Sequence, residues 1–160
     1  MNQIKTELLL LASYLAFFGP KVIVATICGA IIGVEREIKN KVAGIRTNIL
    51  VCVGSTLFTS LALYLSKDMP NIDVTRVIGQ IITGIGFLGG GVIFKFSDKI
   101  TGVTTASFIW IMSAIGCLVG CGFLTLSIVL TLGLLLTTIL FHFVERKINK
   151  VREDKLRDNE

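Results

Sequence analysis

The residues of this chain that could do chemistry are ionisable side chains at the ends of long apolar stretches. Glu35 and Arg36 directly follow one stretch, Arg46 precedes the next, and Asp73 and Arg76 precede a third. A charge within the hydrocarbon of a bilayer costs several kcal/mol, so ionisable residues near that depth are often functional. Two interpretations stay open for this set: headgroup-level anchors and helix caps, or a polar cluster between helices.

Carboxylates are also candidate ligands for a divalent cation. Glu35 and Asp73 are the weak candidates here, but magnesium takes several oxygen ligands and usually retains water. The four cysteines fit small packing residues better than a zinc-type or redox site, which needs more ligands and a tighter motif. We therefore predict no metal site and no cofactor. Because no nucleophile–base–orienter arrangement is visible, we also predict that the protein is not an enzyme.

Residues 77–94, VIGQIITGIGFLGGGVIF, are apolar and contain six glycines. The segment GIGFLG fits the dinucleotide pattern G-x-G-x-x-G, but that fingerprint needs a preceding strand and a following helix. A close helix crossing is the favoured interpretation, and a broken helix facing a cavity is the alternative. We expect this stretch to form the packed centre of the protein. The predicted helix-packing glycines are Gly29, Gly33, Gly84, Gly86, Gly89 and Gly90.

The composition places this chain among polytopic membrane proteins. Of its 160 residues 52% are hydrophobic and only 17% are charged, whereas a soluble domain carries about 25% charged residues. Residues 100–144 lack Asp, Glu, Lys and Arg, which leaves room for two spans. The net charge of +5 comes from basic residues that flank apolar stretches, so it predicts contact with the lipid bilayer and not with nucleic acid.

The elements that must position these residues are about five transmembrane helices, an all-α bundle. We predict spans near residues 21–34, 47–65, 77–94, 103–119 and 123–144, a short amphipathic or apolar helix at 4–18, and a charged cytoplasmic tail at 146–160. Whether residues 4–34 make one span or two stays open. Twelve basic residues on one side against four on the other put the N-terminus outside and the C-terminus inside.

Four motifs then carry a resemblance: GAIIGVERE (29–37), AGIRTNILVCVGS (43–55), DVTRVIGQIITGIGFLGGGVI (73–93) and GVTTASFIW (102–110). In order and spacing they resemble the MgtC/SapB family of bacterial inner-membrane proteins, over residues 20–145. Longer members carry a cytoplasmic domain after the last span, so the chain resembles a short form. The resemblance implies a multi-pass plasma-membrane protein, linked to growth at low magnesium and, in some pathogens, to virulence.

The resemblance also suggests a mode of action and a functional set. The best-known member resembles a regulator of the membrane ATP synthase more than a pump. We therefore expect a non-enzymatic regulator that binds other membrane proteins, or itself, through its glycine faces; the alternative is a small transporter or channel for magnesium or another solute. Positions that match the family's motifs suggest a functional polar cluster of Glu35, Arg36, Arg46, Asp73, Arg76, Thr104 and Thr105.

Overall fold

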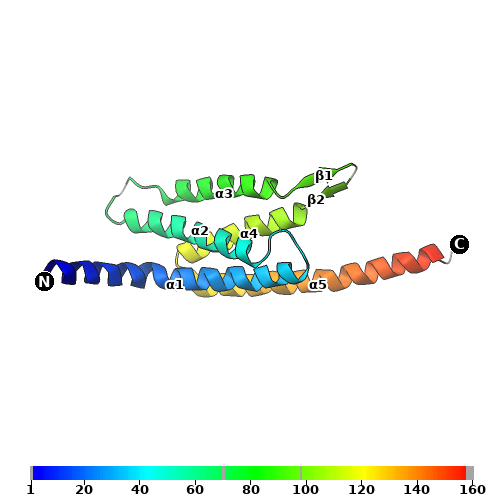
Figure 1. Ribbon diagram of the computed structural model, residues 1–160, viewed down its shortest axis with the longest axis horizontal. Helices are drawn as coiled ribbons and strands as arrows, with labels where there is room; N and C mark the ends of the chain where they lie inside the picture. Colours follow the sequence, from blue (N-terminus) through cyan, green and yellow to red (C-terminus); the bar gives the residue numbers. More distant parts are fainter. Residues whose placement is uncertain (1, 70, 98, 158–160) are drawn as a thin grey trace.

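The computed structural model describes residues 2–69, 71–97 and 99–157. Within these ranges the chain folds into five helices and one small hairpin (Figure 1). The elements are α1 (Asn2–Ile38), α2 (Ile45–Leu65), α3 (Val74–Gly90), β1 (Phe94–Phe96), β2 (Lys99–Thr101), α4 (Val103–Gly120) and α5 (Leu124–Arg157). The predicted all-α class is confirmed, and the two strands are antiparallel with three residues each.

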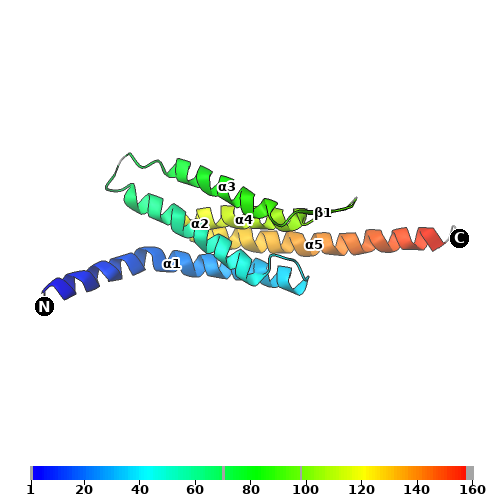
Figure 2. The same cartoon turned by 45° about the horizontal axis from the view of Figure 1, so that its top comes forward.

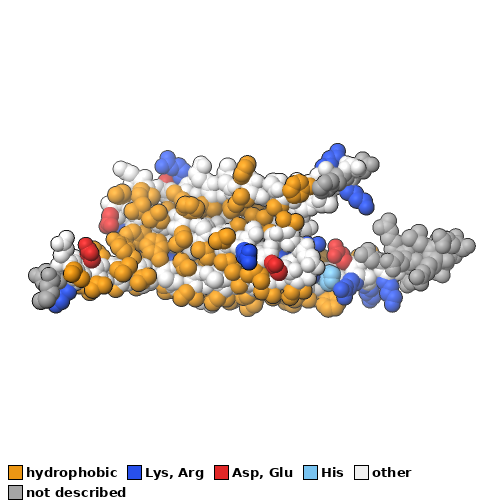
Figure 3. Space-filling view, in the orientation of Figure 1, with side chains coloured by type: hydrophobic (Ala, Val, Ile, Leu, Met, Phe, Trp, Pro, Cys, Tyr) orange, Lys and Arg blue, Asp and Glu red, His pale blue; other side chains and the backbone are white. Residues whose placement is uncertain are grey.

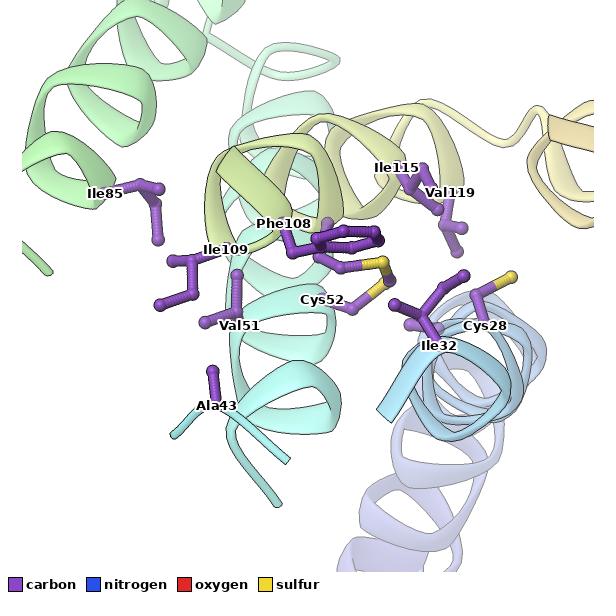
Figure 4. Packing of buried hydrophobic residues seen from close by; sticks show 12 residues of the cluster. Cys28, Ile32, Ala43, Val51, Cys52, Ile85, Phe108, Ile109, Ile115 and Val119 are labelled. Carbon is purple, nitrogen blue, oxygen red and sulfur yellow. The ribbon is translucent and has the colours of Figure 1, made fainter. Parts of the chain in front are cut away.

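Helices α2 and α4 form the centre of the bundle. On one side α1 packs along α2 with α5 beside it, and on the other side α3 lies against α4 and α2 (Figures 1 and 2). The buried apolar cluster draws mainly on α1, α2 and α4, and among the described residues Ile85 is its one buried member from α3 (Figure 4). The expectation that the glycine-rich stretch is the packed centre is therefore wrong: α3 lies at the edge.

Helix α1 is continuous from Asn2 to Ile38, with Pro20 inside it, which corrects the expected division into a short helix at 4–18 and a span at 21–34. A proline removes one backbone donor but does not have to end a helix in an apolar environment, where the backbone has few other partners. Residues 3–16 are exposed, and this end of the helix leaves the bundle at an angle (Figure 2). Residues 4–34 thus contribute one long helix.

The glycine-rich helix also ends earlier than predicted. Its 17 residues reach only to Gly90, and the hairpin of β1 and β2 follows before α4. A helix of this length measures about 26 Å, slightly less than the hydrocarbon core of a typical bilayer. The left-handed backbone of Gly102, at φ 90°, joins the hairpin to α4, and a Cβ there would collide with the carbonyl group of Val92.

Small and hydroxylated side chains make the contact between α2 and α4 close. The Ser55 and Ser113 hydroxyl oxygens are 2.8 Å apart. The Thr56 hydroxyl donates to the Gly116 carbonyl at 2.9 Å, and Ser60 donates to the Gly120 carbonyl at 3.2 Å. A Cβ at Gly116 would meet the Cys52 carbonyl oxygen. The two central helices are therefore joined by interhelical hydrogen bonds and small residues, as is common within membranes.

The outer surface suits a bilayer. Four helices, α1, α2, α4 and α5, are long and apolar enough to cross a membrane, and α3 is a shorter apolar helix. Orange apolar side chains are spread over the face in Figure 3, above all on its left part and lower edge, and most Lys and Arg side chains lie toward the end where the hairpin and α5 project. The described ends of α1 and α5 lie at opposite ends of the molecule (Figure 1). The predicted tail at 146–160 continues α5 as far as Arg157, and residues 158–160 lie outside the described residues.

Candidate functional site

Arg36, in the last turn of α1, is a cation held inside the bundle. It is 3% exposed. Its Nη2 donates to Glu35 Oε1 at 2.8 Å and its Nε donates to Glu35 Oε2, so the pair is bidentate. The guanidinium also lies over the Phe108 ring of α4, with its carbon 4.0 Å from the ring centre. Burial of this charge is possible because the carboxylate and the aromatic face replace water.

Glu35 and Glu37, on either side of Arg36, make different contacts. Glu35 also accepts a salt bridge from Lys39 Nζ at 2.6 Å, one helical turn further on. Glu37 points to the next helix, where its Oε2 accepts the backbone N–H of Ile45 at 3.0 Å. That bond satisfies a free donor in the first turn of α2, because Gly44 offers no side-chain cap. Glu35, Arg36 and Glu37 thus lie at the corner between α1 and α2, and Glu37 connects the two helices.

Beside Arg36 is an open groove of ≈ 850 Å³ between the end of α1, the start of α4 and the middle of α5. Thr104 lines it, whereas Thr105 is buried and lines a smaller neighbouring hollow below the hairpin. The structure therefore brings together four members of the predicted cluster: Glu35, Arg36, Thr104 and Thr105 belong to one end of the bundle.

The other three members of the predicted cluster are not part of this groove. Arg46 is exposed on the first turn of α2. Asp73 and Arg76 are exposed at the start of α3, at the opposite end of the bundle (Figure 1). Asp73 is the N-cap of α3, as its position predicts: its Oδ1 accepts from Thr75 N at 2.9 Å and from the Thr75 hydroxyl at 2.6 Å. That hydroxyl hydrogen bond holds the pKa of the Asp73 carboxyl below its ordinary value.

The predicted packing glycines divide into two groups. A Cβ at Gly29 would lie 2.6 Å from Ile49 Cα, and one at Gly33 would lie 2.5 Å from Ile45 Cα, so both lie at the crossing of α1 and α2. On α3, Gly89 makes an ordinary contact with Ala106 at 3.7 Å. The remaining three have no described atom within 4 Å of a Cβ position, so within one copy of the chain no helix crosses there: Gly84, Gly86 and Gly90.

Two residues of the site were absent from the predicted set. Lys39 lies between the predicted spans at 21–34 and 47–65, and its spacing of four from Glu35 is the spacing of a helical ion pair. Phe108 is four residues after Thr104, one helical turn along the same face of α4. For Lys39 this spacing is a local signal, because α1 continues to Ile38, beyond the predicted end at residue 34. The Arg36–Phe108 contact joins two distant helices and has no local signal.

The described residues contain no group of three or more His, Cys, Asp or Glu side chains that could hold a metal ion. Cys28 and Cys52 belong to the buried apolar cluster, Cys117 is also buried, and Cys121 is partly buried at the end of α4. Glu35 and Asp73, the two weak metal candidates, lie at opposite ends of the bundle.

Comparisons with known proteins agree with the motifs. Over 126 residues the chain is 40% identical to "Putative magnesium transporter YhiD" of Escherichia coli (strain K12). The matched residues make up 76% of this chain and 58% of that protein. It is 41% identical over 107 residues to "Protein MgtC" of Brucella abortus (strain 2308), covering 67% and 44% of the two chains. It is 36% identical over 127 residues to "Protein MgtC" of Salmonella typhimurium (strain 14028s), covering 79% and 53%.

The chain spans about half the length of these curated relatives. No solved structure matches it. The model of the MgtC family matches residues 22–147, which include the α1–α2 corner, the whole of α3 and the groove beside Arg36. On this match and on these relatives, the chain belongs to the MgtC family of membrane proteins.

Proposed function

We propose that this protein is a non-enzymatic regulator in the bacterial inner membrane that binds other membrane proteins, in a process connected with magnesium. The single observation that carries the proposal is the outer face of α3. Gly79, Thr83, Gly86 and Gly90 follow one another at intervals of four, three and four residues, which places them on one helix face. All four are exposed, and the three glycines have no described atom within 4 Å of a Cβ position.

This face is suited to another helix. In a bilayer, small residues let two helix backbones approach closely, and close packing drives their association because lipid offers no hydrophobic incentive. Grooves flank α3 on both sides: one of ≈ 510 Å³ against α2 and one of ≈ 370 Å³ against α4. Trp110, at 54% exposure, lines the groove against α4, and Phe87 of α3 is 84% exposed. A transmembrane helix of a partner, or of a second copy, would cover this surface.

The magnesium connection and the membrane orientation rest on other observations. The Escherichia coli relative is named "Putative magnesium transporter YhiD". Twelve of the sixteen Lys and Arg residues belong to the segments at the end where α5 projects, and positive residues remain in the cytoplasm. We place that end inside the cell and the N-terminus outside.

A photo-crosslinker at Thr83, in membranes of the native host, tests the proposal. We expect a crosslinked polypeptide, and we expect Gly86→Leu to abolish it because the leucine side chain holds the partner backbone away. Gly133→Leu is the matched control, since Gly133 is exposed on α5 and also has no described atom within 4 Å of a Cβ position. Unchanged crosslinking in the Gly86 variant would contradict the proposal.

The second candidate function is transport of magnesium or another solute, and the printed name of the Escherichia coli relative favours it. Glu35 and Asp73 are too far apart in the fold to form one ion site, so backbone carbonyls and water would have to supply most ligands. The purified chain in liposomes would then carry magnesium down a gradient, and Asp73→Ala would reduce the flux. Absence of flux in the unaltered chain would exclude this function.

A further inference from the structure

Several basic side chains line the groove beside Arg36. Lys39, Lys41 and Arg146 line it together with Arg36, and they come from the end of α1, the following loop and α5. His142 and Thr104 add further polar groups, and Glu145 is the acid among the described lining residues. Glu35 is already bonded to Arg36 and Lys39. The charge facing the groove is therefore positive, which favours an anionic ligand.

Within this basic surface, Arg36 is held in place by its neighbours. Glu35 occupies its Nε and Nη2, while no acceptor in the described ranges binds its Nη1. Because Arg36 is 3% exposed yet lines the groove, the atoms it presents there are few and held in place by the Phe108 ring. An arginine that is already oriented loses little side-chain entropy when it binds a phosphate oxygen.

The groove also has a substantial apolar lining. Phe108, which is buried, and Leu134 and Phe141 of α5 supply apolar side chains, and they lie among the polar lining residues Asn40, Thr137 and Thr138. The groove adjoins the last turn of α1, the first turn of α4 and the apolar part of α5. All three helices are candidate membrane spans, and α1 ends and α4 begins beside the groove, so it lies near the edge of the hydrocarbon layer. A ligand that fills the groove must therefore have a charged head and a hydrocarbon part in contact with the bilayer.

We propose that this groove binds an anionic phospholipid, with the phosphate among Arg36, Lys41 and Arg146 and an acyl chain against Phe108 and Leu134. Basic pockets between transmembrane helices on the cytoplasmic side bind such headgroups in other proteins. A soluble phosphate would use the same cations, but it would leave the aromatic and aliphatic lining uncovered. The lipid site does not depend on the partner-binding face of α3, which is a different surface.

Native mass spectrometry of the purified full chain tests the proposal. The protein in detergent is titrated with phosphatidylglycerol and, separately, with phosphatidylcholine of the same acyl chains. The groove variant is Lys41→Gln/Arg146→Gln, and the matched control is Lys95→Gln/Lys147→Gln, which removes the same charge from the same end of the bundle but outside the groove lining. All four residues are exposed, so both variants should fold.

We expect phosphatidylglycerol to bind more tightly than phosphatidylcholine. Its affinity should fall in the groove variant by roughly fivefold for each basic residue removed, and should change much less in the control. Equal losses in both variants would show a diffuse charge effect and overturn the proposal. So would equal binding of the two lipids, or displacement of phosphatidylglycerol by glycerol 3-phosphate at matched concentration, which would identify a site for soluble phosphate.

Discussion

The guanidinium carbon of Arg36 lies 4.0 Å from the ring centre of Phe108, which joins the last turn of α1 to the first half of α4. A cation over an aromatic face gains about 2 kcal/mol when it is removed from water. Arg36 therefore has two anchors, the Phe108 ring on α4 and the Glu35 carboxylate on its own helix. Together they fix one positive charge at the rim of the groove and connect the α1–α2 corner to the centre of the bundle.

Replacing Arg36 should destabilise the fold. Arg36→Leu leaves the nearly buried Glu35 carboxylate with Lys39 alone, and breaking a buried ion pair from one side costs roughly 3 kcal/mol. Arg36→Lys should cost less, because an ammonium keeps the charge but cannot bind Glu35 through two parallel bonds or stack on Phe108. Thermal unfolding in detergent micelles measures both. In the double variant Glu35→Gln/Arg36→Leu part of the stability should return, and a double variant no better than Arg36→Leu would refute this account.

The two groups of glycines should respond oppositely to alanine. Gly33→Ala forces apart α1 and α2, because its Cβ would lie 2.5 Å from Ile45 Cα, and overpacking of this kind costs about 1–3 kcal/mol. Gly86→Ala meets no described atom of the same chain, and alanine restricts the unfolded chain, so it should be neutral or stabilise by up to about 1 kcal/mol. Unfolding of monomers in micelles compares them. Equal destabilisation by both substitutions would be incompatible with the observed packing.

Much of the fold could be predicted from local pattern. Long runs without charge limit where helices can lie, and the predicted span at 47–65 agrees with α2 to within two residues at its start. The cap on α3 was also predictable, since Asp73 stands immediately before an apolar run. These features depend on neighbours within one or two helical turns, and the sequence displays them directly.

The partners of each helix could not be predicted in this way. Glycine spacing shows that a backbone can approach, but not which backbone: Gly33 meets α2, whereas Gly86 meets no helix of the same copy. The density of glycines on α3 thus pointed to the centre of the bundle, although α2 and α4 occupy it. The groove could not be predicted for the same reason: its residues Arg36, Phe108 and Arg146 belong to three different helices, and the sequence does not show which helices pack together.

The hydrogen bond between Ser55 and Ser113 should contribute modestly to the packing of α2 on α4. Its oxygens are 2.8 Å apart and both side chains are buried. Interhelical hydrogen bonds within membranes contribute about 0.6 kcal/mol on average, because the unfolded chain in lipid also finds partners. A double-mutant cycle with Ser55→Ala and Ser113→Ala should give a coupling of that order. Coupling indistinguishable from zero would mean that small size, and not hydrogen bonding, is what this contact requires.

The first turn of α3 should lose protection on acidification. The Asp73 carboxylate accepts hydrogen bonds from Thr75 and from Arg76 N, and its pKa is lowered in the folded chain, mainly by the Thr75 hydroxyl. A group with a lowered folded pKa stabilises the fold above its ordinary pKa, and this contribution disappears as the pH falls through the folded value. We expect hydrogen exchange at the amides of residues 75–77, corrected for the intrinsic pH dependence, to accelerate below the ordinary aspartate value of 3.8. Asp73→Asn should retain the cap through its amide oxygen and show no such transition. If both proteins show the same pH profile, protonation of Asp73 does not control the start of α3.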